Sequence, residues 1–328
     1  MRTRTLGKTG SRVSELGLGG LFVSSVGGSY DQSRSAIRRA LELGVNYIDT
    51  APTYADSESV IGRALEGYGG PLILSTKLGG RPQPFDARNR DHLFASVEES
   101  LRLLKRDHVD ILFIHEPDRP GQYDWWSDPV NYTGPVCDVL DELKEQGVIR
   151  FTGLGGTTAY LMARIVRTGR FDVLLTAFNY SLLWREAEIE VLPAAMEQGM
   201  GIVIGSPLQQ GALARRYDDE VARGAPWLSL PRRKQLLELY ALLDDTGLSI
   251  TEMALRFVLS NDAVACTLMG ARSATEVERN VEAAEKGPLP PEILARLDEI
   301  AAQVPFRPFD EPAGLPLGRP YAGPGMMH

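Results

Sequence analysis

Residues 45–58 read VNYIDTAPTYADSE, and this stretch is the strongest indicator of the fold. An apolar run leads to Asp49, Tyr54 follows five residues later, and a helix is predicted to begin at Ser57. The pattern places a carboxylate and a phenol in the loop at the carboxyl end of a strand, where α/β barrels carry out their chemistry. An unperturbed phenol has a pKa of about 10 and is a poor acid or base at neutral pH, so we expect a cation nearby.

Two further predicted strands end in titratable residues. Lys77 closes the run PLILSTK, and His115 closes the run VDILFIH. Taken alone, Asp49 could cap a helix and Tyr54 could be ordinary packing. Lys77 alone would be a surface charge, and His115 alone a hydrogen-bonded strand-end side chain. Their coincidence at the ends of three successive strands favours a functional site instead.

Strand-like and helix-like segments alternate along the chain. The predicted strands are residues 15–19, 45–49, 72–77, 109–115, 150–153, 172–176, 201–205 and 263–269. The predicted helices are residues 33–43, 57–65, 90–104, 136–145, 159–167, 186–197, 250–259 and 275–285. Eight strands and eight following helices without a linker predict an α/β fold with a single (β/α)8 TIM barrel domain over residues 1–328. A doubly wound sheet in two domains would need a boundary, and none is visible.

Three further segments lie outside this repeat. A hairpin-like start is predicted around residues 6–11, and extra helices are predicted at residues 232–243 and 291–303. The tail from about residue 305 is rich in Pro and Gly and also contains Phe306, Phe309 and Tyr321. It could be disordered, but its aromatic content favours a tail that folds over the barrel mouth.

The composition restricts the class of protein. Hydrophobic residues make up 43% of the chain and charged residues 24%, which is typical of a soluble enzyme. The net charge of −8 argues against nucleic acid or an anionic membrane as a partner. No signal peptide and no apolar run of about 20 residues is present, so we expect a cytoplasmic protein.

Metal and disulfide sites are not expected. The chain has two cysteines, Cys137 and Cys266, without a C-x-x-C pair, and only four histidines. His92 and His108 are interpreted as structural. A metal-dependent barrel hydrolase is disfavoured, because the strand ends lack the clustered His and carboxylates of two-metal chemistry.

Asp49, Tyr54, Lys77 and His115 together resemble the catalytic tetrad of the aldo-keto reductases. Further segments that resemble this family are residues 46–58, 75–77, 114–115, 147–153, 206–213 and 270–273, together with Asn280. The resemblance extends to about residue 284. It implies an NAD(P)(H)-dependent oxidoreductase that interconverts an aldehyde, ketone or sugar hemiacetal and its partner redox form. The substrate would be a small molecule, and a homo-oligomer is possible.

The four residues also form a coherent set for carbonyl chemistry. Tyr54 would donate a proton to the carbonyl oxygen as general acid, and its phenolate would act as base in the oxidative direction. Lys77 would lower the pKa of the phenol, and Asp49 would hold Lys77 charged and oriented. His115 would donate a hydrogen bond to the substrate oxygen or share the proton with Tyr54. A slow-turnover regulatory barrel protein that binds the cofactor is the alternative, and the intact tetrad disfavours it.

The resemblance also implies the residues that hold the cofactor. They are Gly155, Asn179, Ser206, Leu208, Gly211, Gly270, Arg272, Glu276 and Asn280. NADP(H) is slightly favoured over NAD(H), because Arg272 and Arg279 could meet a 2′-phosphate. Glu276 would repel that phosphate, but it could accept a hydrogen bond from a ribose 2′-hydroxyl. Arg215 and Arg216 could clamp the pyrophosphate or simply be solvated.

The chain departs from the family pattern at four places, one of which is the region of Asn179, where the family commonly has a Gln that binds the nicotinamide carboxamide. Ala55 follows the tetrad tyrosine where Gly is usual. Gly155 and Gly156 replace a Ser-Asn pair that binds the nicotinamide carboxamide, and Gly205 replaces an aromatic residue that stacks on the ring. These changes are similar to a branch with galactose, threo-aldose and pyridoxal dehydrogenases, which favours a polyol, sugar or lactol substrate.

Aromatic side chains in the predicted loops are candidates for the walls of the substrate pocket. These residues are Phe22, Phe85, Trp125 and Trp126, with Trp184 as a further candidate. The pair Trp125 and Trp126 is the preferred one, because it lies in a polar loop. Ordinary loop packing is the alternative for each of them.

Overall fold

Eight parallel strands close into a barrel in the computed structural model, which describes residues 1–307, 311 and 315–319. Around the barrel the strands follow the order β10-β3-β4-β5-β6-β7-β8-β9. Their bounds are β3 Leu16–Gly19, β4 Tyr47–Asp49, β5 Ile73–Leu78, β6 Val109–His115, β7 Ile149–Gly156, β8 Val173–Ala177, β9 Gly201–Gly205 and β10 Cys266–Gly270. The predicted (β/α)8 barrel is confirmed.

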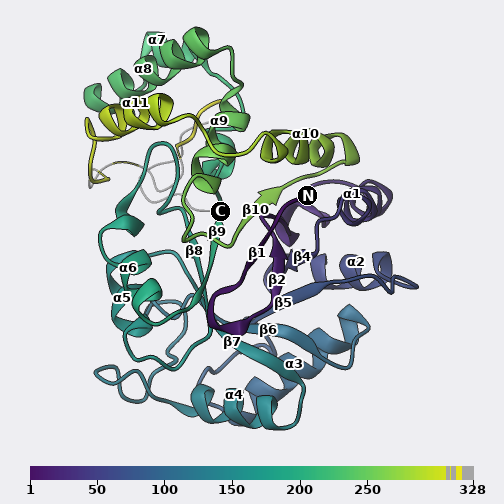
Figure 1. The fold of residues 1–328 in the computed structure, drawn as a ribbon. Coiled ribbons are helices and arrows are strands. Elements are labelled where there is room, and N and C mark those ends of the chain that lie inside the picture. The colour runs from purple at the N-terminus through teal and green to yellow at the C-terminus, as the bar shows by residue number, and fades with distance from the viewer. Residues whose placement is uncertain (308–310, 312–314, 320–328) are drawn as a thin grey trace.

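Helices surround the barrel, as Figure 1 shows. Their bounds are α1 Tyr30–Glu42, α2 Ser57–Ala64, α3 Arg90–Leu104, α4 Pro135–Glu145, α5 Tyr160–Val166, α6 Val191–Glu197, α7 Asp218–Arg223, α8 Leu230–Thr246, α9 Ile250–Leu259, α10 Ala274–Glu285 and α11 Pro291–Ala301. Short 3-10 helices are η1 Gly7–Thr9, η2 Gly20–Phe22, η3 Glu186–Glu188 and η4 Gln209–Gly211. Helices α8 and α11 pack on each other beside the barrel, with α7 against α8.

One predicted helix is wrong in its extent. The helix expected at residues 186–197 is divided into η3 and α6, with non-helical backbone at Glu190, where φ is −135° and ψ is −47°. Pro193 has no N–H to donate to the carbonyl four residues earlier, and its ring clashes with that carbonyl, so a continuous helix cannot pass through this point. Helix α7 was not predicted.

Alternation along the strands decides which side chains enter the barrel. Tyr47, Ile111 and Phe113 belong to the cluster inside the barrel, whereas Leu112 and Ile114 pack under the surrounding helices. Successive side chains of a strand point to opposite faces. His115, two residues after Phe113, therefore has the inward parity, and by the same rule so does Asp49, two residues after Tyr47.

The N-terminal hairpin closes the amino end of the barrel. Strands β1 Thr3–Thr5 and β2 Arg12–Ser14 pair antiparallel, and the hairpin places Leu6 and Val13 in the interior cluster. Lys8 N donates to Gly199 O at 2.7 Å. A side chain at Gly7 would lie 2.3 Å from Gly201 N, so only glycine fits here. The carboxyl end is consequently the end at which a ligand can enter.

The described part of the tail is ordered against the helices beside the barrel. Leu315 and Leu317 are buried, and Gly318 N donates to Glu220 on α7 at 2.7 Å. Glu311 forms a buried ion pair with Arg232 on α8. Phe309 and Tyr321, on which the prediction of a folded tail partly rested, lie outside the described residues, and Phe306 is exposed.

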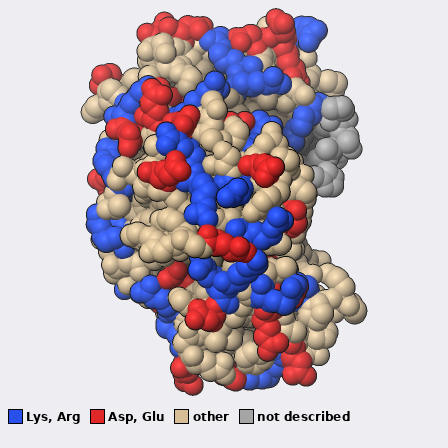
Figure 2. Space-filling view, turned by 90° about the vertical axis from the view of Figure 1, so that its right-hand side faces the viewer, with Lys and Arg blue, Asp and Glu red and all other residues tan. Residues whose placement is uncertain are grey.

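The surface carries charges of both signs. Figure 2 shows acidic and basic side chains interspersed on one face. Ion pairs between such groups include those of Arg39 with Glu42 and Glu278. Within the described residues, no helix combines the length and the apolar character required to cross a membrane.

Candidate functional site

The four predicted residues Asp49, Tyr54, Lys77 and His115, here called the tetrad, meet at the carboxyl end of the barrel. Lys77 Nζ donates to Asp49 Oδ2 at 2.6 Å and to the carbonyl of Thr50 at 2.7 Å. Both charged side chains are buried. A buried ion pair is stable only when its remaining polar atoms are satisfied, and Ser75 Oγ does this by donating to Asp49 Oδ1 at 2.7 Å.

Tyr54 and His115 complete the group above this pair. The Lys77 ammonium lies 4.6 Å from the centroid of the Tyr54 ring. The rings of Tyr54 and His115 meet edge to face, with centroids 6.1 Å apart. A phenol, an imidazole and a buried ammonium therefore converge on one point at the mouth.

The net pKa of Tyr54 differs from the expectation. Burial raises the pKa of the phenol, and the Lys77 charge lowers it only in part, so the pKa lies above its ordinary value. Lys77 lowers the pKa of the phenol as predicted, but by less than burial raises it. Tyr54 is therefore a protonated phenol across neutral pH, which suits a proton donor.

Lys77 and His115 have opposite shifts. Burial lowers the pKa of Lys77, but the attraction of Asp49 and Tyr54 outweighs it, so the net pKa is raised and the ammonium stays charged. Burial and the Lys77 charge lower the pKa of His115 to about 3. His115 is therefore neutral at pH 7, and its Nδ1 is buried without a hydrogen-bond partner among the described residues.

The loops around the tetrad contain strained backbone. Ala55 has φ of 49°, Glu116 has φ of 49° and Ser206 has φ of 54°. Residues other than glycine rarely adopt this left-handed region, and such positions cluster at functional sites. Ala55 therefore adopts with strain the conformation that a glycine, the residue usual in the family pattern, adopts without it.

Gly155 lies beside the tetrad, whereas the Cβ direction of Gly156 points to the opposite side of β7, toward Met162 and Asp118. A Cβ added to Gly155 would point toward the Lys77 stem, with Cε 3.7 Å away. Asn179, predicted to approach the nicotinamide, is buried and its Nδ2 donates to the carbonyls of Thr157 and Ala177 at 2.9 and 3.0 Å. Because Gly155 has no side chain, the space next to the Lys77 stem stays free for a ligand group such as a planar ring.

The other predicted cofactor residues lie on two segments after β9 and β10. Ser206, Leu208 and Gly211 belong to the loop that enters η4, where Gly211 has φ of 104°. Gly270 ends β10, and Asn280 is buried on α10. These segments border the same end of the barrel, since β9 and β10 are neighbours in it.

Arg272 is already paired in this structure. Its backbone N–H and its guanidinium both donate to the carboxylate of Glu276, at 2.8 and 2.9 Å. The side chain of Arg272 remains 61% exposed in this pair. An exposed ion pair is worth only about 0.2–1 kcal/mol, so a phosphate could draw Arg272 away.

Trp125 and Trp126, the preferred candidates for the pocket wall, are both buried. Trp125 has no exposed surface, and its Nε1 donates to the carbonyl of His115 at 3.1 Å. Trp126 Nε1 donates to Pro117 O at 3.0 Å. Both indoles therefore hold the segment after β6 in place through hydrogen bonds to backbone carbonyls. Phe85, partly exposed, covers Trp125 at a ring distance of 5.7 Å.

Two further aromatic candidates have other neighbours. A Cβ added to Gly270 would lie 2.9 Å from the ring of Phe22, so Phe22 packs on the end of β10. Trp184 is buried, and its Nε1 donates to Glu311 of the tail at 3.0 Å. Tyr123 was not predicted, yet its ring lies 5.4 Å from that of Phe85.

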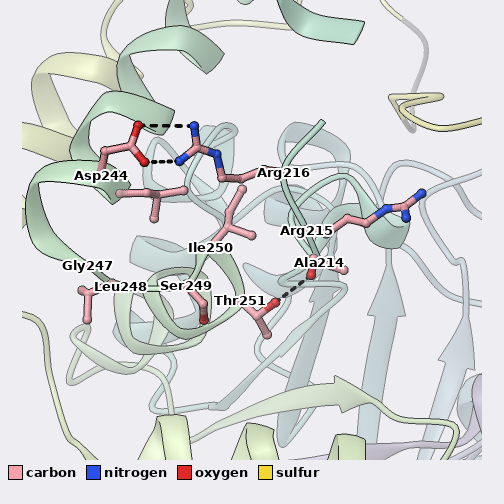
Figure 3. Close-up of a pocket in the computed structure, with 10 residues that line it drawn as sticks. Ala214, Arg215, Arg216, Asp244, Gly247, Leu248, Ser249, Ile250 and Thr251 are labelled. Carbon is pink, nitrogen blue, oxygen red and sulfur yellow. Dashed lines mark hydrogen bonds and ion pairs between the residues drawn. The ribbon is translucent and has the colours of Figure 1, made fainter. Parts of the chain in front are cut away.

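Arg215 and Arg216 differ in the side chains that they contact. They line a surface hollow of about 550 Å³ between the loop after β9 and the start of α9. Figure 3 shows Arg216 held by Asp244, whereas the Arg215 guanidinium points away from that pair. Arg216 also pairs with Asp218. Arg215 stacks over Tyr217, and within the described residues it has no acidic partner.

Ser75 is the contact of the tetrad that sequence reasoning missed. It lies two residues before Lys77 on β5, so alternation gives both side chains the inward direction. That spacing could have identified it. No group of His, Cys, Asp and Glu suited to a metal ion occurs within residues 1–307, 311 and 315–319.

Comparison with known proteins extends over the same region. The model of the aldo/keto reductase family matches residues 15–302. L-galactose dehydrogenase of Arabidopsis thaliana is 31% identical over 85% of this chain and 87% of its own length. L-glyceraldehyde 3-phosphate reductase of Escherichia coli is 27% identical over 92% of this chain and 93% of its own. The solved holo form of aldo-keto reductase AKR11C1 from Bacillus halodurans has a TM-score of 0.76 at 29% identity, covering 93% of this chain and 98% of that one.

Proposed function

The chain belongs to the aldo/keto reductase family, and we propose that it is an enzyme in which Tyr54 transfers the proton while a nicotinamide cofactor transfers the hydride. The observation that carries the proposal is the buried Asp49–Lys77 pair directly beside Tyr54. The family membership supports an NAD(P)-dependent oxidoreductase of carbonyl compounds. The assignment of the individual steps is our own.

The geometry divides the work among the four side chains. Tyr54 donates its phenolic proton to the carbonyl oxygen in reduction and accepts it back in oxidation. The Lys77 ammonium stabilises the phenolate that forms, and Asp49 keeps Lys77 charged and in place. His115, neutral at pH 7, donates a hydrogen bond to the same oxygen. A bound nicotinamide supplies or accepts the hydride.

For the cofactor we propose NADP(H) in preference to NAD(H). Arg272 is an exposed cation just before α10, and its pair with Glu276 is weak enough for a 2′-phosphate to replace. Arg279, exposed on the same helix, adds a second positive charge.

For the substrate we propose a polyol-type aldehyde or sugar hemiacetal. The support is the 31% identity to a protein named L-galactose dehydrogenase and the polar end of the loop after β6. In that loop Glu116 directly follows His115 and pairs with Arg119. Hydroxyl groups next to the reacting carbon could hydrogen-bond to such side chains.

The test has two stages. Protein fluorescence is titrated with NADPH and then NADH, and the tighter cofactor is used in a screen of aldoses, apolar aldehydes and ketones. Tyr54→Phe should reduce turnover at least about a hundredfold and change the cofactor Kd less than about threefold. Retained turnover in this variant would remove Tyr54 as the proton donor, and failure of both cofactors to bind would remove the proposed function as a whole.

A further inference from the structure

Two buried hydroxyl groups continue the tetrad into the interior of the barrel. Ser75 Oγ donates to Asp49 Oδ1 at 2.7 Å, and the hydroxyl of Tyr47 lies 3.1 Å from Ser75 Oγ. Neither Tyr47 nor Ser75 has any exposed surface, and Asp49 is 2% exposed. The three side chains therefore form a chain of hydrogen bonds that is shielded from solvent.

The chemistry of the three groups fixes the direction of this chain. Asp49 is paired with the Lys77 ammonium, and an ionised carboxylate accepts hydrogen bonds but cannot donate them. Ser75 therefore gives its only hydroxyl proton to Asp49. The bond between Ser75 and Tyr47 then requires Tyr47 to be the donor. Donation by Tyr47 polarises the Ser75 hydroxyl and strengthens the bond that Ser75 makes to the carboxylate.

The barrel interior is shaped to hold the Tyr47 ring. A Cβ added to Gly17 on β3 would lie 2.9 Å from Tyr47 Cδ1, so a glycine at this position leaves the space that the phenol occupies. Burial raises the pKa of Tyr47 well above its ordinary value, so the phenol keeps the proton that it donates. Phenylalanine would fill this space without the cost of burying a hydroxyl, which indicates that the Tyr47 oxygen serves the bond to Ser75.

Ser75 supports the Asp49 oxygen that does not bind Lys77. Lys77 Nζ donates to Oδ2 at 2.6 Å, and no other residue in the described part of the chain donates to Oδ1. Without the Ser75 hydroxyl, Oδ1 would be a buried acceptor with no partner, which destabilises the charged form of a carboxylate. The nearest proton that could neutralise it is carried by the Lys77 ammonium.

We propose that Ser75, held by Tyr47, is a positioning residue for the tetrad, an inference that rests on the proposed function above. It keeps Asp49 ionised and thereby keeps Lys77 charged beside Tyr54. In the reaction Tyr54 passes its proton to the carbonyl oxygen, and the Lys77 ammonium stabilises the phenolate that remains. The protons of Ser75 and Tyr47 are not transferred, because this chain only holds the ion pair in its charged form.

The Tyr54 phenol reports the state of the ion pair. Burial raises the pKa of Tyr54, and of the two neighbouring charges Lys77 lowers it more strongly than Asp49 raises it. A proton that moves from Lys77 to Asp49 removes both charges, so the pKa of Tyr54 should rise further. A weakened chain is therefore visible as a higher titration midpoint of one phenol.

Other titratable groups near the chain do not obscure this signal. Those that face Tyr54 or Tyr47 from β6, from the residue after it and from β10 are His115, Glu116, Asp110 and Cys266. His115 is neutral above its depressed pKa of about 3, and burial raises the pKa of the Cys266 thiol. The two carboxylates each form an ion pair with an arginine. None of these four side chains bonds to Ser75.

The first test needs no substrate. The full chain is labelled with 3-fluorotyrosine, whose fluorine signal follows the ionisation of each phenol, and the Tyr54 signal is assigned with Tyr54→Phe. In Ser75→Ala the titration midpoint of Tyr54 should rise by at least about 0.5 pH unit. Tyr47→Phe, which keeps the ring and removes only its hydroxyl, should shift the midpoint in the same direction by a smaller amount.

Thr76→Val is the matched control. Thr76 is also buried on β5, and its hydroxyl donates to another buried carboxylate, that of Glu58, at 2.6 Å. Alternation along the strand directs Thr76 to the face opposite to Ser75. The control loses a bond of the same kind, but its Tyr54 midpoint should stay within about 0.2 pH unit of wild type.

The second test measures turnover. The tighter-binding of NADPH and NADH is used with DL-glyceraldehyde as the probe substrate. Ser75→Ala should lower kcat about threefold to tenfold, since one unit of pKa corresponds to a factor of ten at most. The cofactor Kd should change less than about twofold, because neither hydroxyl of the chain is exposed to a ligand. Thr76→Val should retain the kcat of the wild type.

The outcomes distinguish the role of Ser75 from the proposed function. If neither cofactor binds the wild type, the proposed function fails, and the fluorine titration still decides on Ser75. If cofactors bind but Ser75→Ala keeps the wild-type midpoint, this inference fails alone. If Ser75→Ala does not fold, as judged by its thermal melt against Thr76→Val, an unshifted midpoint in Tyr47→Phe overturns it. If Tyr54 does not titrate before the protein unfolds, a kcat of Ser75→Ala within about twofold of wild type overturns it.

Discussion

The ion pair between Arg232 on α8 and Glu311 in the tail allows a worked prediction for Glu311→Gln. Arg232 has no exposed surface, and its Nε and Nη2 donate to the two carboxylate oxygens at 2.7 and 3.0 Å. Glu311 also accepts from Trp184 Nε1, while Arg232 lies over the Trp184 ring at 4.6 Å. The pair thus connects the tail, α8 and the loop after β8.

Glu311→Gln keeps the volume of the side chain and removes its charge. The single amide oxygen of Gln cannot accept both guanidinium hydrogen bonds in the geometry of the carboxylate. The new NH2 group is itself a donor and lies opposite a guanidinium donor. Breaking a buried pair by removing one partner costs about 3–5 kcal/mol. With an unfolding entropy of about 2.1 cal/mol/K per residue over 328 residues, Tm should fall by about 4–7 °C.

The assay is a thermal melt followed by far-UV circular dichroism at pH 7. Glu299→Gln is the control, because Glu299 forms an exposed pair with Arg296 and should change Tm by less than about 1 °C. Adding Arg232→Met to Glu311→Met should recover most of the loss, since apolar residues can replace a buried pair. A Glu311→Gln protein that melts within about 1 °C of wild type would refute the reasoning.

Three further predictions follow from the same structure. Lys77→Met should lower kcat by about a hundredfold to ten-thousandfold. Adding Asp49→Asn should restore stability, because it removes the carboxylate charge left without its partner, but it should not restore turnover. A Lys77→Met variant with more than a tenth of wild-type kcat would contradict the role of Lys77. Because the pKa of His115 is depressed to about 3, the folded protein binds fewer protons than the unfolded chain below pH 6.5, so stability falls as the pH falls through this window. Wild type should therefore lose about 2 kcal/mol relative to His115→Gln between pH 6.5 and 5, measured by urea unfolding at each pH, and parallel curves would contradict the shift. Gly7→Ala should destabilise the protein by about 1–3 kcal/mol more than Gly67→Ala. Both glycines have positive φ, but of the two only Gly7 has backbone atoms 2.3 Å from where a Cβ would lie. Equal melting temperatures of the two variants would argue against closure of the barrel by the hairpin.

Much of the candidate site could be predicted, because successive side chains along a strand point to opposite faces of the sheet. Asp49 and His115 end their strands and Lys77 is the last residue but one of β5, and each lies two residues after a side chain that enters the barrel or, like Ser75, faces the site. Parallel strands in a closed barrel bring those ends together without further information. The same alternation would have identified Ser75.

Other parts could not be predicted, because their partners are distant in the chain. Trp125 was expected to wall a pocket, but its indole reaches the His115 carbonyl and is buried. Arg216 is held by Asp244, 28 residues away, and Trp184 by Glu311, 127 residues away. No periodicity in the sequence marks such pairs.

The sequence by itself determined the barrel, the convergence of the tetrad and the family, because these follow from side-chain period and strand order. Only the tertiary structure decided how the surroundings act on that site. Burial outweighs Lys77 in setting the direction of the Tyr54 pKa shift. Asp118 accepts from the backbone N–H groups of Thr157 and Thr158, which lie 39 and 40 residues further along the chain. Both are consequences of desolvation and of contacts between segments that do not adjoin in the chain, and these exist only once the chain has folded.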